Sequence, residues 1–423
     1  MLLGFLRSQE KNINTKDKME KSNSALFGLG SGAKKPKNRS TVLLLDAEGL
    51  SHYTSYLAYG LSRYMNVILY GLSLNDYVLT GAAKAKGIQF NNIGEKYPKG
   101  NFIVLKLARR LLFFLRVLFM SLIKETKYDI VHIQGHLPLF FLFLPILKLK
   151  SKQICWTLHD VNLRPSYTGI KAVLELWYMR AVAQPSILEK YTDAIIVHGS
   201  LLKKQLISKG VNQDKIYVIP HFDYMYLANC INNDQATTPG YNIHSDYLLL
   251  FGRIVPYKGI NILFDAVRIA RRDTKRKFNI LIAGKGDLSD FKKLLKKEDY
   301  EYIHIYNEFI PSYQIPDLFK KAKFLILPYT DASQSGIIPL AYTFSKPVVV
   351  SNVASLPEYV EHETTGYIFE SGNSTQLASY ITDLVNNDDK CIEMGKKASQ
   401  KLLREMSLEL CCKIINDIYI SNC

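Results

Sequence analysis

The stretch YLLLFGRIVPYK, which ends at Lys258, constrains the fold of this chain more than any other. Its first residues form a short, continuous apolar run, which is typical of a strand buried on both faces of a parallel sheet. Gly252 ends the run and allows close approach of the backbone. Arg253 and Lys258 follow, and the apolar residues of 260–272 recur at helical spacing. This order is typical of a phosphate site at the carboxyl end of a sheet, although two surface cations in a loop are an equal alternative.

The composition points to a globular protein with an anionic partner. The chain has 423 residues, which is enough for two domains with substantial cores. Lys and Arg total 54 against 38 Asp and Glu, a formal charge of +16 that suits a membrane phospholipid, a nucleotide, a phosphorylated acceptor or nucleic acid. The six cysteines lack zinc spacing and are too sparse for a disulfide framework, which favours a reducing cytosol.

The amino-terminal half alternates predicted strands and helices after a polar, basic arm at 1–39 that we expect to be disordered. A buried strand starts at Thr41, a turn containing Gly49 follows, and the segment 53–63 has helical spacing. This is a βαβ opening. It lacks the GxGxxG fingerprint of a dinucleotide site. Further strands are predicted within 67–70, 128–136, 153–165, 193–200 and 215–222.

The segment 102–123 has the length of a membrane-spanning helix, but four cations interrupt it. Charges near the centre of a bilayer are costly, so we do not expect this segment to span. Its cations cluster broadly on one side, which suits a helix lying on an anionic membrane surface. An ordinary helix packed on the sheet, with its basic side in water, is an equal alternative. The cations are Lys106, Arg109, Arg110 and Arg116.

Histidines gather near the ends of the predicted strands of the first half. Because the carboxyl edge of a parallel sheet opens into a crevice, we expect His159 in particular to be a cleft residue. The histidines could in principle hold zinc, but no carboxylate or cysteine pattern accompanies them, so no metal is expected. The residues concerned are His132, His136, His159, His198 and His221.

The polar segment 232–245, which contains adjacent Pro239 and Gly240, is the best candidate for a linker. The alternation of strands and helices restarts after it. Two similar α/β halves joined by a linker create a cleft that the strand ends of both halves face. The strands predicted in the second half lie within 248–251, 279–287, 303–310, 324–329 and 346–353.

The second half carries the segments GRIVPYKG, NILIAGKGD, FLILPY, KPVVVSN and LPEYVEHETTGYIFE. Together they resemble the carboxyl-terminal domain of glycosyltransferase family 4. The first half carries VLLLDAEGL, TLHDV, DAIIVHGS and VIPHF, which are similar to the acceptor-side domain of that family. The resemblance implies an α/β fold of the GT-B type, with two facing Rossmann-like domains. It also implies a retaining transferase that uses a nucleotide-sugar as a substrate, with no cofactor and no metal.

The resemblance also implies roles for particular residues. Arg253 and Lys258 match the cations on the donor diphosphate, where they would neutralise charge as the nucleoside diphosphate leaves. His159 matches a histidine near the donor sugar and the leaving phosphate. Gly49 matches a loop whose backbone approaches the same phosphates. The remaining donor-binding positions are Gly252, Gly284, Glu308, Phe309, Ser335, Gly336 and Ile337. Each residue also has a purely structural alternative. Arg253 and Lys258 would then be surface cations, His159 a strand-end histidine bonded to Asp160, and Phe309 a core residue.

The chain departs from the family at one place. The family carries a pair of glutamates just before the segment that matches KPVVV, for the donor sugar and the ribose hydroxyls. Here those positions fall on Ala332 and Leu340, or on Ser333 and Ala341 in the next register. Neither register contains a glutamate. The local polar replacements are Asp331, Ser333, Gln334 and Ser335.

These observations predict a hexosyltransferase of polysaccharide biosynthesis that is cytoplasmic and peripheral on the inner face of the plasma membrane. The expected partners are a nucleotide-sugar, a glycolipid or polysaccharide acceptor and an anionic membrane surface, without nucleic acid. The alternative is a degenerate GT-B domain that binds a nucleotide-sugar or a partner enzyme without turnover. The predicted units are the arm 1–39, an acceptor-side domain 40–235, a nucleotide-sugar domain 246–405 and a helix in 406–423 that packs back on the first domain.

Overall fold

In a computed structural model, the chain is described over 39–46, 51–71, 88–92, 115, 128–135, 140–160, 185–229 and 246–422. Several sequence-based predictions fall outside these ranges. They are residues 1–38 of the arm, the glycine Gly49, the basic segment 102–123 apart from Leu115, the histidine His136, and the whole of the proposed linker 232–245.

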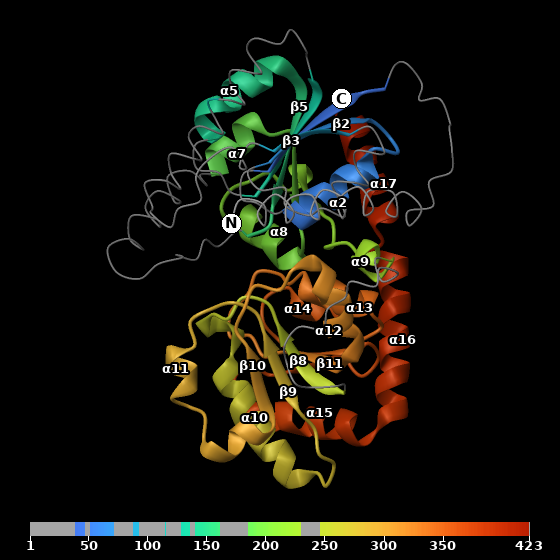
Figure 1. The fold of residues 1–423 in the computed structure, drawn as a ribbon. Coiled ribbons are helices and arrows are strands. Elements are labelled where there is room, and N and C mark those ends of the chain that lie inside the picture. The colour runs from blue at the N-terminus through green and yellow to red at the C-terminus, as the bar shows by residue number, and fades with distance from the viewer. Residues whose placement is uncertain are drawn as a thin grey trace, which may run out of the picture.

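The described residues form two α/β units, one above the other in Figure 1, which confirms the predicted fold class. The first unit holds a seven-stranded sheet in the order β3-β2-β1-β4-β5-β6-β7, and every neighbouring pair of strands is parallel. Its strands are β1 (Thr41–Asp46), β2 (Asn66–Gly71), β3 (Gln89–Asn92), β4 (Tyr128–Gln134), β5 (Ser151–Leu158), β6 (Ala194–Val197) and β7 (Ile216–Val218). Its helices are α2 (Ser51–Leu61), α5 (Phe140–Lys150), α7 (Pro185–Tyr191), α8 (Ser200–Ser208) and α9 (Met225–Asn229).

The second unit holds a six-stranded parallel sheet in the order β10-β9-β8-β11-β12-β13. Its strands are β8 (Tyr247–Phe251), β9 (Ile280–Ala283), β10 (Ile303–Tyr306), β11 (Ala322–Leu327), β12 (Val348–Ser351) and β13 (Gly366–Phe369). Its helices are α10 (Ile260–Asp273), α11 (Ser289–Lys292), α12 (Ile315–Lys321), α13 (Ile337–Thr343), α14 (Leu356–Tyr359), α15 (Ser374–Asn386) and α16 (Asp388–Glu405).

The central strands are apolar along their length because helices cover both faces of each sheet. The first four residues of β8 are buried, and alternate residues belong to two different core clusters. Leu248 and Leu250 pack under α10, whereas Tyr247 and Leu249 face the opposite layer. This explains the continuous apolar run in the sequence, since neither face of the strand meets water.

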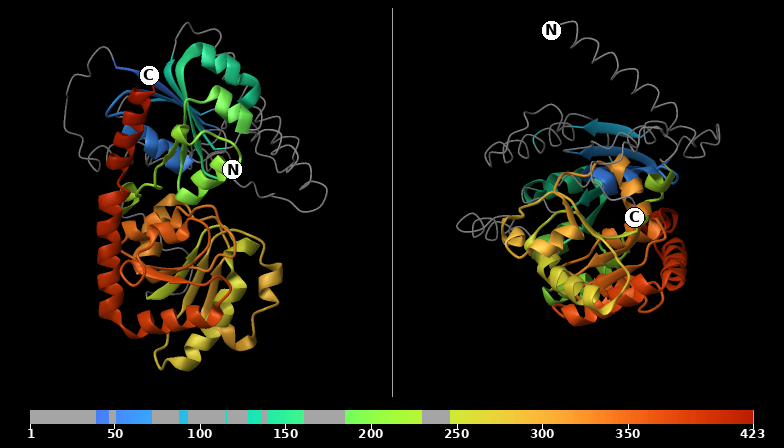
Figure 2. Two further views of the ribbon diagram at one scale, coloured as in Figure 1. Left: turned by 180° about the vertical axis from the view of Figure 1, so that it is seen from behind. Right: turned by 60° about the horizontal axis from the view of Figure 1, so that its bottom comes forward.

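The last two helices tie the units together. In Figure 1, α16 runs along the side of the second unit, and α17 (Leu408–Ser421) continues along the first; Figure 2 shows the same column from behind. Helix α17 packs against α2. The two approach closely at Gly60, where a Cβ would lie 2.4 Å from the Cys412 sulfur. The domain boundaries near 235 and 246 stay a prediction.

Among the helices of the described ranges, none combines the length and the apolar composition needed to cross a bilayer. The basic segment 102–123, on which the membrane-surface prediction depends, is not part of these ranges.

Candidate active site

The loop after β8 lies where the strand order of the second sheet reverses, between β8 and β11. Ligand crevices form at such switch points. Gly252 takes a left-handed φ of 103° there. Gly284, which follows β9, has a φ of 149°, and a Cβ on it would lie 2.0 Å from the Gly252 carbonyl oxygen. Glycines therefore let the loops after β8 and β9 pack against each other.

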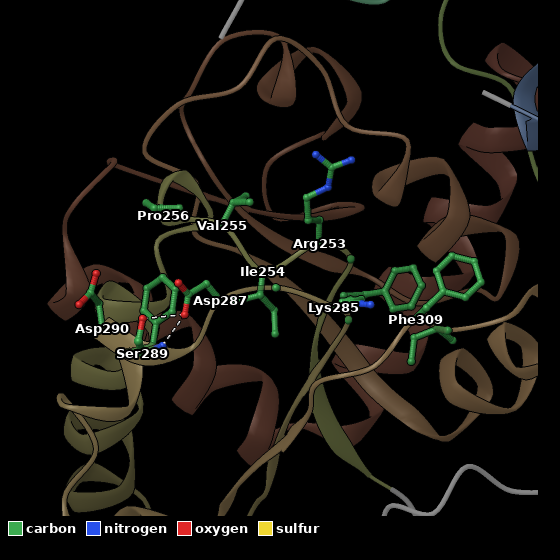
Figure 3. Close-up of a pocket in the computed structure, with 15 residues that line it drawn as sticks. Arg253, Ile254, Val255, Pro256, Lys285, Asp287, Ser289, Asp290 and Phe309 are labelled. Atoms are coloured by element: carbon green, nitrogen blue, oxygen red, sulfur yellow. Dashed lines mark hydrogen bonds between the residues drawn. The ribbon is translucent and has the colours of Figure 1, made fainter. Parts of the chain in front are cut away.

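These two loops and the residues after β10 surround a cavity of about 760 Å³ (Figure 3). Arg253 is exposed and extends on the other side of the cavity from the Asp287–Ser289 turn. The Phe309 side chain is 71 % exposed, so the alternative that it belongs to the core is wrong. The cavity is lined by Phe251, Gly252, Arg253, Ile254, Val255, Pro256, Gly284, Lys285, Gly286, Asp287, Ser289, Asp290, Phe291, Phe309 and Ile310.

Lys258 is buried, unlike Arg253, and only 7 % of it is exposed. Its ammonium donates a hydrogen bond to the Tyr329 hydroxyl and lies 4.1 Å from the centroid of that ring. Burial, with a smaller contribution from the nearby Arg253 charge, lowers the pKa of Lys258 from 10.5 to about 8. A Cβ on Gly252 would lie 3.7 Å from the Lys258 nitrogen, so this cation faces the glycine turn.

Ser335, Gly336 and Ile337 follow β11 and lead into α13. The Ser335 side chain is hydrogen-bonded to the Tyr329 hydroxyl, so Ser335 and Lys258 share that partner. A Cβ on Gly336 would lie 2.9 Å from the Tyr224 hydroxyl and 3.2 Å from Nε2 of His221. Gly336 is thus one position where groups of the first unit reach the second.

His159 lies just after β5 and is buried in a cluster of rings. The Tyr53 ring packs at a right angle to the His159 ring with centroids 4.6 Å apart, and the His198 ring lies 4.7 Å away. Nδ1 of His159 is 3.1 Å from Nε2 of His198, and Nε2 of His159 is 3.4 Å from Oε1 of Gln134. Both ring nitrogens of His159 therefore have side-chain partners.

The neighbouring histidines are neutral, because burial disfavours a charged ring. Burial lowers the pKa of His132 to about 3 and that of His198 to about 4. It lowers the pKa of His221 to about 3, with a further contribution from His198. His132 bonds to Thr157 and to Tyr419 of α17, so the cluster extends from the cleft to the last helix.

Hydrogen bonds join the two units beside these histidines. The Ser333 hydroxyl donates to the Asp160 carboxylate. The Tyr359 hydroxyl donates to the His198 carbonyl oxygen at 2.6 Å and accepts from the His221 amide at 3.0 Å. The carboxyl ends of both sheets thus meet, as predicted for a cleft between two α/β halves.

The Glu358 side chain, at the start of α14 in the second unit, caps the start of a helix of the first unit. Its carboxylate accepts hydrogen bonds from the amides of Ser200 at 2.7 Å and Leu201 at 3.2 Å, at the beginning of α8. Gly199 allows this approach, because a Cβ there would lie 2.2 Å from the Ser355 hydroxyl.

The predicted site residues divide into two groups. Four of them line the cavity, namely Gly252, Arg253, Gly284 and Phe309. Glu308 accepts a hydrogen bond from the Tyr306 hydroxyl at 3.2 Å and is exposed beside that lining. Of the other described positions, Gly336 faces Tyr224 and His221 of the first unit, and His159 lies on the first unit's side of the junction. Lys258 and Ser335 share the Tyr329 hydroxyl, and the Ile337 side chain faces Gly252.

Within the residues that the structure describes, no group of three or more His, Cys, Asp or Glu side chains is arranged to hold a metal ion.

Family models match both halves of the chain. The model described as Glycosyl transferases group 1 matches residues 240–401, and the model described as Glycosyltransferase Family 4 matches residues 49–222. Together these matches span most of both units. The chain belongs to the group 1 glycosyltransferases.

Individual group 1 relatives are distant. An uncharacterized glycosyltransferase of Methanocaldococcus jannaschii is 24 % identical over 250 residues, which cover 56 % of this chain and 68 % of the relative. The poly(ribitol-phosphate) alpha-N-acetylglucosaminyltransferase of Staphylococcus aureus is 28 % identical over 162 residues, covering 37 % of this chain and 32 % of that enzyme. Anabaena HepE, solved in complex with UDP-glucose, superposes with a TM-score of 0.64 and 16 % identity, covering 90 % of this chain and 99 % of HepE. The HepE likeness shows the shared GT-B fold.

The family's second glutamate has two candidate positions in this chain, and both lie in the core. Leu340 and Ala341 are apolar and buried in α13, so neither supplies a carboxylate for ribose hydroxyls. Of the candidates for the first, Ala332 is buried and Ser333 bonds to Asp160.

Sequence reasoning named His159 and His198 as strand-end histidines but missed Gln134, which lies near the end of the strand predicted within 128–136. A polar residue at the end of a buried strand was the available signal. Tyr53 and Tyr359 gave no signal, because their contacts join segments distant in the sequence.

Proposed function

We propose that this group 1 glycosyltransferase moves a sugar from a nucleotide-sugar to a lipid-linked or polysaccharide acceptor, with retention of anomeric configuration and without a metal ion. The observation that carries the proposal is the pair of cations at the end of β8. Exposed Arg253 borders the cavity, and buried Lys258 faces the glycine turn beside it.

The two cations suit a departing nucleoside diphosphate. Arg253 presents a planar fork that matches phosphate oxygens, and Lys258 supplies a point charge held in one position by Tyr329. Charge that develops on the leaving diphosphate is stabilised by groups already in place, which lowers the barrier without reorganisation. In this reaction the acceptor hydroxyl attacks the face of the sugar that the diphosphate leaves. Because Gly252 has no side chain, a phosphate can lie directly against the backbone there.

The comparisons support the classes of donor and acceptor. HepE was solved with UDP-glucose, and the S. aureus relative acts on poly(ribitol-phosphate). A uridine nucleotide is therefore the first donor to test, and an anionic polymer is a suitable acceptor for a chain with a charge of +16.

We place the reaction at the cytoplasmic face of a membrane. The positive charge and the basic segment 102–123 motivate this part of the proposal. Co-sedimentation with vesicles of anionic phospholipid at low salt tests it. Binding that weakens as salt is added supports a membrane surface, whereas protein that stays in the supernatant at low salt contradicts it.

The main experiment measures nucleotide release from a panel of UDP- and GDP-sugars, with and without membrane extract as the source of acceptor. Release from one donor that depends on extract establishes transfer and identifies that donor. The anomeric configuration of the product, read by NMR, tests retention, and activity after chelator treatment tests metal independence. Inversion, or loss of activity that added divalent metal restores, contradicts those two parts.

The positions of the missing glutamates favour a second candidate, a domain that binds a nucleotide-sugar or a partner enzyme without turnover. Leu340 and Ala341 are buried, and Ser333 is engaged by Asp160. Tight binding of a nucleotide-sugar that is not consumed with any acceptor fraction supports this candidate over the transferase.

A further inference from the structure

One carboxylate of the first unit is held by a loop of the second unit. Asp160 follows β5, directly after His159, and its carboxylate accepts a hydrogen bond from the Ser333 hydroxyl. Ser333 lies between β11 and α13 and is only 6 % exposed. The Asp160 carboxylate therefore lies at the junction of the two units, beside the loop that follows β11.

The same loop reaches the buried cation of the second unit. Ser335, two residues after Ser333, is hydrogen-bonded to the Tyr329 hydroxyl, which accepts from the Lys258 ammonium. Two residues of extended chain span at most about 7 Å. The Asp160 carboxylate and the Lys258 network thus lie at the two ends of one short segment.

A nucleotide-sugar bound through Lys258 brings its sugar to this segment. The sugar is joined to the diphosphate through a single oxygen, so it lies next to the cation that holds the phosphate. The first unit borders this place, because Tyr224 and His221 approach Gly336. A sugar beside Lys258 therefore meets groups of both units.

The hydroxyls of a sugar need acceptors, and this segment has two. A carboxylate has room for several hydrogen bonds, so Asp160 can accept from a sugar hydroxyl while it accepts from Ser333. Hydrogen bonds to a charged acceptor are also about twice as strong as those between neutral groups. Beside Ser333, the Gln334 amide oxygen is shielded from solvent and has no hydrogen-bond partner among the described residues. Such an unpaired acceptor is costly, and a second sugar hydroxyl would pair it.

We propose that Asp160 binds the hydroxyls of the transferred sugar, and that Ser333 is the positioning residue that holds its carboxylate in place. The role rests on the proposed transferase activity. It accounts for the absence of a glutamate at Ala332 and Ser333, because the first unit supplies the carboxylate instead. The second unit then holds the diphosphate and the first unit holds the sugar, so the donor spans the junction.

The bond between Ser333 and Asp160 could serve only to join the units, and Asp160→Asn separates the two roles. The asparagine oxygen still accepts from Ser333, so the link is retained while the charge is lost. Calorimetry without acceptor gives two dissociation constants, one for the tightest binder of a panel of UDP- and GDP-sugars and one for its own nucleoside diphosphate. We expect Asp160→Asn to weaken the nucleotide-sugar by about tenfold or more and to leave the diphosphate unchanged. Equal changes for both ligands, or no change for either, overturn the proposal.

Two further variants sharpen the comparison. Asp214→Asn removes an exposed carboxylate before β7, at the opposite edge of the first sheet, and should change neither constant. The double variant Asp160→Ala, Ser333→Glu returns a carboxylate from the second unit, so it should bind the nucleotide-sugar more tightly than Asp160→Ala alone. A chain that binds a nucleotide-sugar but never turns it over fails as a transferase, while the two constants still decide the sugar contact of Asp160. A wild-type chain that binds the diphosphate but no nucleotide-sugar overturns both proposals.

Discussion

The buried ammonium of Lys258 makes the affinity for a nucleoside diphosphate depend on pH. Burial lowers the pKa of this group from 10.5 to about 8, so in the free protein it loses its proton just above neutral pH. A bound diphosphate favours the charged form and raises the pKa again. Binding therefore takes up a proton once the pH exceeds about 8, and affinity falls as pH rises.

The size of this effect follows from the shift. One unit above its pKa, only about a tenth of the lysine is protonated, so the apparent dissociation constant for UDP should rise about tenfold between pH 7 and pH 9. The diphosphate itself is fully ionised throughout, because its last pKa is near 6. Isothermal titration calorimetry in two buffers of different ionisation enthalpy measures both the affinity and the proton uptake.

Two variants provide controls for Lys258. Lys258→Arg keeps a charge that does not titrate in this range, so its UDP affinity should not vary with pH. Lys258→Met should bind weakly at every pH. A wild-type chain whose affinity varies with pH no more than that of Lys258→Arg refutes the reasoning, since the buried ammonium would then not be the group that titrates.

Two further predictions concern the backbone and the junction of the units. Gly259→Ala should lower the free energy of unfolding by more than about 2 kcal/mol in chemical denaturation, because Gly259 has a φ of 67° and a Cβ would lie 1.8 Å from the Pro328 carbonyl oxygen. Gly372→Ala is the matched control, because Gly372 has a φ of 85° but open space around it. This variant should lower the free energy of unfolding by only about 1 kcal/mol. Equal losses in the two variants would mean that the contact with Pro328 is unimportant. Glu358→Ala should uncap α8, lower the free energy of unfolding by about 1 kcal/mol and speed hydrogen exchange at the first amides of α8, and unchanged exchange there would show that the cap across the units is absent in solution.

The parts predicted correctly from sequence depend on local patterns. The apolar run before Gly252 identifies a central strand because such a strand is buried on both faces, and the glycine and cations that follow mark its carboxyl end. The same logic located the strand before His159 and the two-domain fold. Local sequence sufficed, since the apolar run and the glycine that ends it lie within a few consecutive residues.

The contacts that sequence could not predict join distant segments. Glu358 caps a helix that lies far earlier in the chain, and Tyr359 bridges the backbone of His198 and His221. His198 lies between the His159 ring and the Ile219 carbonyl oxygen, which belong to two other segments of the chain. Such relations follow from how the two units meet, and no spacing in the sequence encodes that junction.

The role of Arg253 at the end of β8 is tested most directly by the rate of nucleotide release from the preferred donor. The comparison is between the wild type, Arg253→Ala and Arg272→Ala, the last removing an exposed arginine from the far end of α10. We expect Arg253→Ala to lower kcat by about a hundredfold or more and Arg272→Ala to leave it unchanged. Equal rates in all three proteins would contradict a diphosphate site at the end of β8.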